Sequence, residues 1–118
     1  MALSRLAQQF ADEIRNHDWS DAPWRLDRAG HRREYDTNIG ETPQLNPRET
    51  DNVRTNVMWV VGQVLGYQDP NFDPYEFAEA CGVSTTTRSG RPRSGHIEAG
   101  LRIDADGRFM PPGGWFGE

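Results

Sequence analysis

Two histidine-containing segments carry the side chains best suited to proton transfer or metal binding. His17 is followed directly by Asp18, and His31 is followed by Glu34 and Asp36. Imidazole and carboxylate groups act as general acids and bases and as ligands of divalent metals. Neither segment has the spacing of a known metal motif, such as a histidine pair one helical turn apart with a glutamate. We therefore predict no metal site and no cofactor, and a metal-dependent enzyme using His31, Glu34 or Asp36 is the least favoured hypothesis.

The other reactive groups in the sequence are isolated from one another. Cys81 is the single cysteine, which excludes an internal disulfide and a cysteine-based zinc site. It shares a predicted helix face with Phe77 and Ala78, so we expect it to be buried and inert. Asp104 and Asp106 resemble the start of a calcium-binding loop, but the later ligands are missing, which indicates turn residues. Because no phosphate-binding loop or nucleophile motif is present, we predict that the chain is not an enzyme and has no catalytic residue.

The basic residues are unevenly placed. All 13 are arginines, against 18 acids, and the net charge is −5. An arginine-only composition is typical of a high-GC genome; selection for bidentate contacts to phosphate or carboxylate is the alternative. The negative charge makes nucleic acid an unfavoured partner for the surface as a whole. Residues 83–96 carry Arg88, Arg91 and Arg93 without any acid, and we expect a flexible loop or linker there. These three arginines are the contacts of an alternative hypothesis, a nucleic-acid-associated protein.

Trp59 is the sharpest candidate for a binding residue. On a helical wheel it lies opposite a row of valines and shares its face with Thr55, Gly62 and Gly66. A glycine inside a helix costs roughly 1 kcal/mol relative to alanine, so Gly62 indicates the close approach of another element. Trp59 either packs within the protein, against the N-terminal helix or the Trp19–Trp24 segment, or anchors a partner protein or a second copy of the chain.

Two other segments combine aromatic side chains with mobile or basic surroundings. Trp115 and Phe116 belong to a Gly- and Pro-rich tail, residues 111–118, which either tucks into the core or serves as a short binding peptide. The segment from Trp24 to Arg33 places arginines beside an aromatic anchor, as many interfaces do. The partner-binding residues that we predict are therefore aromatic anchors, one small residue and arginine rim contacts: Trp59, Gly62, Trp115, Phe116, Trp24, Arg28, Arg32 and Arg33.

Three predicted helices position these side chains. Apolar residues at three- and four-residue spacing predict a helix over 2–16, and its core face holds Leu3, Leu6, Phe10 and Ile14. Each of the other two helices begins with a capping residue, a proline and a glutamate. These starts, Asn46-Pro47-Arg48-Glu49 and Asp73-Pro74-Tyr75-Glu76, predict helices over 47–65 and 74–81. The core face of the longer helix is predicted to be a valine row widened by Leu65 and Met58: Val53, Val57, Val60, Val61 and Val64.

The rest of the chain is predicted to be less regular. Residues 17–45 look like ordered loop with a short helix from Pro23 to Ala29, and Leu101–Ile103 and Arg108–Met110 predict a β-hairpin. The fold is thus predicted to be α+β and predominantly α, with a three-helix core and a C-terminal β-hairpin. One small domain covers residues 1–110, and the aromatic tail follows. No signal peptide or membrane span is recognised, so we expect a cytoplasmic protein.

A short part of the chain resembles proteins of a particular origin. Asn71-Phe72-Asp73, followed by Phe77-Ala78-Glu79-Ala80-Cys81-Gly82, is similar to a segment of small proteins from actinobacteria and their phages. Those proteins mostly have no assigned activity, so the resemblance implies no catalytic residue. It implies a high-GC host or its phage, and small phage proteins of this kind often bind and redirect a host protein. The function we predict is accordingly a non-enzymatic protein–protein interaction module, such as a phage-encoded modulator of a host protein, with a homodimer through Trp59 and Gly62 as the other partner hypothesis.

Overall fold

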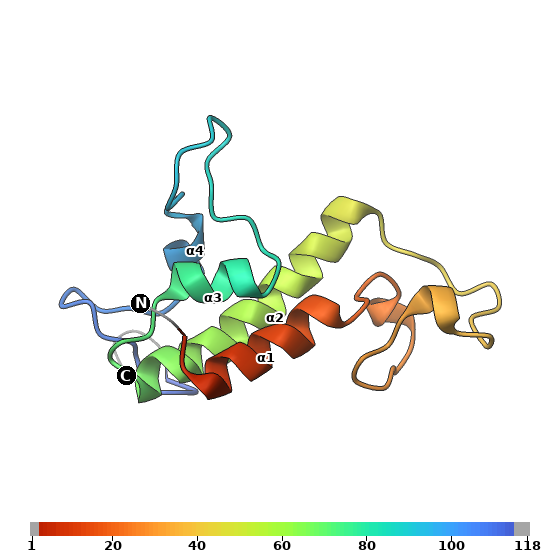
Figure 1. The fold of residues 1–118 in the computed structure, drawn as a ribbon, viewed down its shortest axis with the longest axis horizontal. Coiled ribbons are helices and arrows are strands. Elements are labelled where there is room, and N and C mark those ends of the chain that lie inside the picture. Colours follow the sequence, from red (N-terminus) through yellow and green to blue (C-terminus); the bar gives the residue numbers. More distant parts are fainter. Residues whose placement is uncertain (1–2, 115–118) are drawn as a thin grey trace.

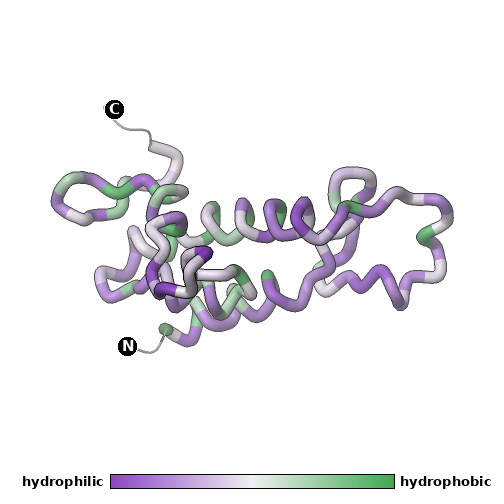
Figure 2. Tube along the Cα trace, turned by 90° about the horizontal axis from the view of Figure 1, so that it is seen from above, coloured by the Kyte–Doolittle hydropathy of each residue, from purple (hydrophilic) through white to green (hydrophobic). Residues whose placement is uncertain are grey.

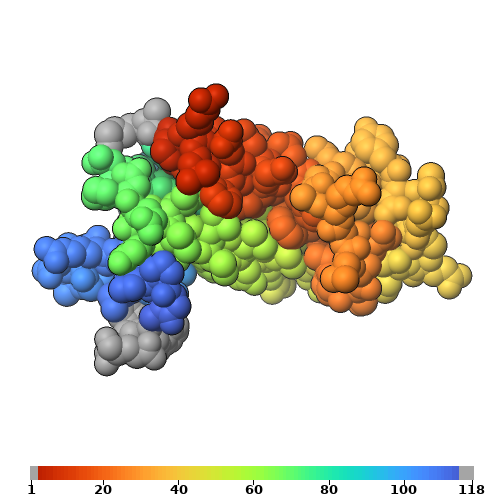
Figure 3. All heavy atoms as spheres, turned by 90° about the horizontal axis from the view of Figure 1, so that it is seen from below, coloured from red at the N-terminus to blue at the C-terminus, as the bar shows by residue number. Residues whose placement is uncertain are grey.

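The computed structural model describes residues 3–114, and within this range the regular structure is helical. The elements in chain order are α1 (Arg5–Asn16), η1 (Ala22–Trp24), η2 (Arg33–Tyr35), α2 (Pro47–Gln68), α3 (Pro74–Ala80) and α4 (His96–Ala99) (Figure 1). The long helix α2 runs beside α1, with α3 and α4 at one end and residues 17–45 at the other. The space-filling view shows α1 and α2 side by side between these two ends (Figure 3). The molecule is elongated, with extents of 50 × 34 × 29 Å.

The predicted helix starts are confirmed by their hydrogen bonds. The Asn46 side chain accepts from the Glu49 N–H at 2.8 Å, and the Glu49 carboxylate accepts from the Asn46 N–H at 3.0 Å. This reciprocal pair satisfies two backbone donors that the helix itself leaves free. Asp73 likewise accepts from the Tyr75 N–H at 2.9 Å at the start of α3. The local sequence at both starts therefore determines where the chain becomes helical.

The core lies where α1, α2 and α3 meet, with one residue added by α4. Its fully buried members are small or compact on α1 and larger elsewhere: Ala7, Ala11, Met58, Phe77, Ala78, Cys81 and Ile97. Small side chains on α1 let that helix approach α2 and α3 closely. The expected burial of Cys81 is confirmed, and burial raises the pKa of its thiol to about 12. The thiol therefore stays protonated and unreactive at neutral pH.

The two predicted core faces are only partly correct. Ile14 is buried, and Leu3, Val57 and Val61 pack against the core as predicted. Leu6 and Phe10 are 56% and 41% exposed, and on α2 the side chains of Val60 and Val64 are 71% and 43% exposed. The buried face of α2 includes Met58 and Leu65, which were predicted to widen the valine row, and also the two glycines on the other side of the helix. A Cβ on Gly66 would lie 2.4 Å from the Phe109 ring, so glycine is required for that ring to pack there. The valine row was the most regular apolar pattern, so it was predicted to be the buried face. The later segments of the chain pack instead on the side of α2 that carries Gly62 and Gly66.

The predicted C-terminal β-hairpin is wrong, and the fold is mainly α. Between residues 3 and 114 there is no β-strand, and the segment contains one isolated bridge between Ile103 and Phe109. The predicted turn forms, but the backbone beyond it bonds to a helix. The buried side chain of Gln63 donates to the carbonyl oxygens of Arg102 and Met110 at 3.1 and 3.0 Å and accepts from the Arg102 N–H at 2.8 Å. Because no third strand continues the ladder, an extended hairpin has little to stabilise it.

Candidate functional site

Residues 17–45 form a separate unit at one end of the molecule, which we call the polar lobe. Figure 2 shows that hydrophilic residues predominate there. Its two ends are tied together, because the Leu45 N–H donates to the Ser20 carbonyl at 2.6 Å and the Asp18 N–H donates to the His31 carbonyl at 2.9 Å. The lobe is fixed to α1 by the Trp19 indole, which donates to the Ile14 carbonyl at 2.9 Å. Its geometry is therefore set by backbone closure more than by helical structure.

The burial pattern of the polar lobe is inverted. Ser20 and Asp21 are buried, and the side chains of Asp27 and His31 are only 5% and 7% exposed. Three large apolar side chains of the lobe are exposed instead: Trp24, Leu26 and Tyr35 are 46%, 100% and 79% exposed. Burying acids and imidazoles is costly unless their charges are paired or satisfied by hydrogen bonds. The lobe therefore has a charged interior and displays an apolar surface.

The interior is a cluster of carboxylates around one imidazole. The His31 Nε2 atom lies 3.2 Å from Asp21 Oδ2, and its Nδ1 atom lies 3.7 and 3.8 Å from carboxylate oxygens of Asp27 and Asp36. Arg25 bridges the latter two acids, with nitrogen–oxygen distances of 2.6 Å to each. Sequence analysis named His31 and Asp36 but missed Asp21 and Asp27. Their alternation with arginines was the available signal, yet irregular backbone gives no periodicity from which to infer a shared interior.

Nearby hydrogen bonds shift the pKa values of this region. The Gly30 N–H donates to His17 Nδ1 at 3.2 Å, and burial followed by the neighbouring His31 lowers the pKa of His17. Burial raises the pKa of Asp18, but hydrogen bonds from Ser20 and from the backbone of Arg33 outweigh that effect and lower it. A backbone hydrogen bond from Asn38 lowers the pKa of Asp36, as does Arg25. The carboxylates of Asp18 and Asp36 are therefore ionised near pH 7, and His17 is neutral.

The structure divides the predicted arginine contacts of the lobe into two kinds. Arg33 is structural, because its guanidinium donates to the carbonyls of Pro43 and Thr42 at 3.0 and 2.9 Å and lies 3.7 Å from Asp21. Arg28 and Arg32 are exposed, and neither guanidinium is hydrogen-bonded or ion-paired to another residue in the described range. Both arginines, together with Leu26 and Tyr35, line a surface hollow of about 520 Å³. Asp27 and His31 also border this hollow, so it connects the lobe interior to solvent.

The predicted pair Trp59 and Gly62 is used inside the molecule. The Trp59 indole donates to the Ile97 carbonyl at 2.8 Å and meets the His96 ring edge-on, with centroids 5.4 Å apart. Trp59 therefore holds α4 against α2. Gly62 is buried and faces the Phe77 ring of α3. These contacts support the intramolecular alternative, with α4 rather than α1 as the packing partner. The predicted tail contacts Trp115 and Phe116 lie outside the described residues.

The basic segment over residues 83–96 is an ordered loop that ends in α4. Its base is closed by the Ser94 N–H, which donates to the Thr85 carbonyl at 3.0 Å. Arg93 is occupied: it pairs with Asp73 at 2.9 Å, and its guanidinium lies 4.7 Å from the centre of the Tyr75 ring. Arg88 and Arg91 are exposed on the projecting part of the loop. Only two of the three predicted arginines are thus available to a phosphate.

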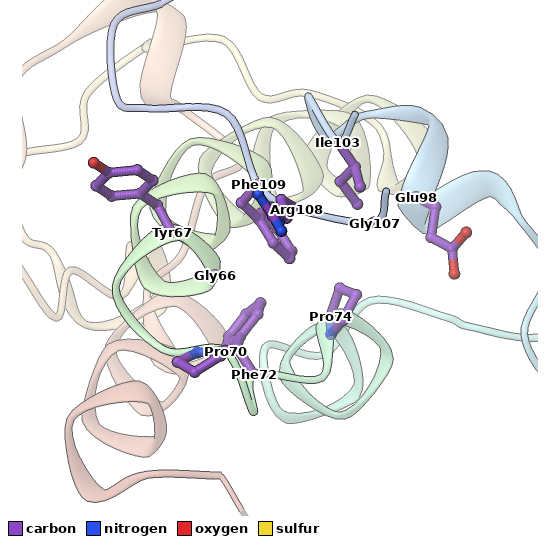
Figure 4. A pocket seen from close by; sticks show the side chains of 10 residues that line it. All are labelled: Gly66, Tyr67, Pro70, Phe72, Pro74, Glu98, Ile103, Gly107, Arg108 and Phe109. Carbon is purple, nitrogen blue, oxygen red and sulfur yellow. The ribbon is translucent and has the colours of Figure 1, made fainter. Parts of the chain in front are cut away.

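A second hollow lies at the opposite end of the molecule from the polar lobe. It has a volume of about 610 Å³ and lies between the end of α2, the start of α3 and the C-terminal segment (Figure 4). Phe72 and Phe109 form its apolar walls, with ring centroids 5.9 Å apart, and Glu98 and Arg108 are its charged residues. No histidine or cysteine lines it. The hollow is a packing seam, and the polar lobe is the stronger candidate site.

Comparison with known proteins gives no indication of function, so the proposal below is based on the geometry of the structure. No family model matches the chain, and no similar curated protein or solved structure is found. Among residues 3–114, no helix combines the length and the apolar character needed to cross a membrane.

Proposed function

We propose that this protein is a non-enzymatic interaction module whose partner-binding surface is the outer side of the polar lobe. The observation that carries the proposal is the display of Leu26 and Tyr35, which are 100% and 79% exposed, around one hollow. The lobe does not use these side chains to form its interior. Apolar groups grouped at a polar-rimmed hollow are typical of surfaces that bind another protein.

The charges around the hollow favour a partner of defined chemistry. Arg28 and Arg32 border it without an ion-pair partner among the described residues, so the complementary surface presents carboxylates around an apolar side chain. Arginine and tyrosine are enriched among the residues that dominate binding energy. Occlusion of a host protein's surface, the activity implied by the resemblance to phage proteins, needs no catalytic group. The single cysteine suits the cytoplasmic compartment that we propose.

Nucleic acid is a weaker candidate for the same surface. The polar lobe carries four arginines but six acids, so its field does not favour a phosphate backbone. In the basic loop, Arg93 already pairs with Asp73. Capture of partners in the presence and absence of nuclease separates the two candidates, since a protein partner persists after nuclease treatment.

Leu26→Asp tests the proposal directly. The substitution changes a side chain that is fully exposed, so the melting temperature should stay unchanged. Capture by the tagged protein from an actinobacterial lysate should fall by about 30-fold, the equivalent of about 2 kcal/mol for a residue at the centre of an interface. Quantitative mass spectrometry of the captured proteins measures the change.

Val60→Asp is the matched control, because Val60 is an apolar side chain that is 71% exposed on α2, outside the polar lobe. It should retain full capture. Equal capture by the wild type and Leu26→Asp, or recovery of the bait alone, would contradict the proposed surface.

A further inference from the structure

We infer that the interior of the polar lobe is a divalent-cation site in which Asp21, Asp27 and His31 each supply one ligand atom to a zinc ion. One donor atom from each of the three residues lies within 4.8 Å of the other two. Donor atoms around a tetrahedral zinc with bonds of about 2.1 Å are roughly 3.4 Å apart. The 3.2 Å between His31 Nε2 and Asp21 Oδ2 already has this spacing.

An unsatisfied carboxylate oxygen points to a missing ligand. Asp21 is completely buried, and its Oδ1 atom has no hydrogen-bond partner among the residues that the structure describes. A buried polar oxygen left without a partner costs about 1–3 kcal/mol. The other oxygen, Oδ2, is hydrogen-bonded to His31 Nε2 at 3.2 Å, so a cation bound by both oxygens of this carboxylate would satisfy Oδ1 and take the place of that hydrogen bond.

The local charge balance also favours a divalent cation. The groups around His31 comprise four aspartates and two arginines: Asp18, Asp21, Asp27, Asp36, Arg25 and Arg33. The formal charges of these six groups sum to −2, which one divalent ion cancels. Burying this excess charge without a counterion would be unfavourable.

Access and ligand chemistry agree with this site. Asp27 and His31 border the hollow of about 520 Å³, which provides an entry path from solvent. Two carboxylates with one imidazole suit zinc better than magnesium or calcium, which prefer oxygen alone. The buried hydrophobic residues of the described chain all lie outside the lobe, and small units without a hydrophobic core are commonly held by a structural metal.

Zinc titration of the full chain, stripped with a chelator, tests the site. Calorimetry and native mass spectrometry should show one zinc ion per chain, and zinc should raise the melting temperature. Asp21→Asn and His31→Gln should each weaken zinc binding by about 10-fold or more, because even outer partners of a metal contribute this much. Glu34→Gln is the matched control within the lobe, since Glu34 is exposed and lies outside the cluster, and it should bind zinc as the wild type does.

If a variant fails to fold, zinc binding can still be tested on the wild-type protein by nuclear magnetic resonance of its histidine rings. Stoichiometric zinc should shift the His31 ring signals and leave those of the exposed His96 unchanged. Absence of saturable one-to-one binding, equal zinc affinity of a folded Asp21→Asn, or a shift confined to His96 would each overturn the inference.

Discussion

The His17 imidazole couples protonation to the backbone of the polar lobe. Its Nδ1 atom accepts a hydrogen bond from the Gly30 N–H, and this contact requires the neutral ring. Because burial and then His31 hold the folded-state pKa below the ordinary value of about 6.5, the unfolded chain takes up this proton first as the pH falls. The stability that neutral His17 contributes is thus present above about pH 6.5 and is lost as the pH falls through the lowered folded-state pKa.

His17→Gln should reduce the loss of melting temperature between about pH 7.5 and about pH 5, relative to the wild type. The carboxylates Asp18 and Asp36 do not interfere, since their lowered pKa values place their titration below this interval. His96→Gln serves as the control, because His96 is exposed on α4. A pH dependence that is identical in His17→Gln and the wild type would show that another group is responsible.

Residue type alone identified part of the lobe's chemistry. His31 and Asp36 could be named because imidazole and carboxylate groups are always candidate ligands or acid–base groups. Asp21 could not be singled out, because its significance comes from complete burial beside His31, and no sequence pattern predicts burial in irregular backbone. Arg33 was predicted to contact a partner, but its reach to the carbonyls of Thr42 and Pro43 depends on the closure of the lobe.

At the scale of the elements, one close contact limits how α4 packs on α2. A Cβ on Gly100 would lie 1.9 Å from the Trp59 ring, and Gly100 has a φ of −90°, which any residue can adopt. Gly100→Ala should therefore destabilise the protein by steric overlap, by about 1–3 kcal/mol. Denaturant unfolding followed by circular dichroism measures the effect.

Gly62→Ala provides the contrast for that substitution. A Cβ there would lie at an ordinary contact distance of 3.7 Å from the Phe77 ring, and the position is helical. Alanine should be neutral or stabilise by up to about 1 kcal/mol. Equal losses of stability in the two variants would mean that Trp59 does not restrict the approach of α4.

The elements differ in how much of their structure could be predicted. The starts of α2 and α3 were predictable because a cap, a proline and a glutamate act within one helical turn. The buried face of α2 was not, since it depends on Phe109 reaching Gly66 from a distant part of the chain. The predicted hairpin stays too short to form strands: two backbone hydrogen bonds cross it, from Asp104 to Arg108 and from Met110 to Arg102, and its other anchor is the Gln63 side chain of α2, which no local pattern could predict.

At the scale of the whole molecule, the helices α1 and α2 connect the polar lobe at one end to α3, α4 and the C-terminal segment at the other. The C-terminal segment is held to α2 by buried Ile97, by Trp59 and by Gln63, while the loop before it projects from the body (Figure 1). A specific protease site inserted between Ser89 and Gly90 should thus be cut readily. The two fragments should stay together in gel filtration and separate in denaturant. Separation under native conditions would show that the contacts on α2 are too weak to hold the segment.

The hydrogen bond from the Leu45 N–H to the Ser20 carbonyl has a consequence for the design of the chain as a whole. It brings the two ends of the intervening segment together, so residues 21–44 form a closed loop at the end of the α1–α2 pair. A segment with adjacent ends can be exchanged for a short turn, or grafted between other helices, without changing the distance that its hosts must span. The polar lobe thus has the geometry of an interchangeable cassette, in which its surface and its interior can vary while the helical frame is retained.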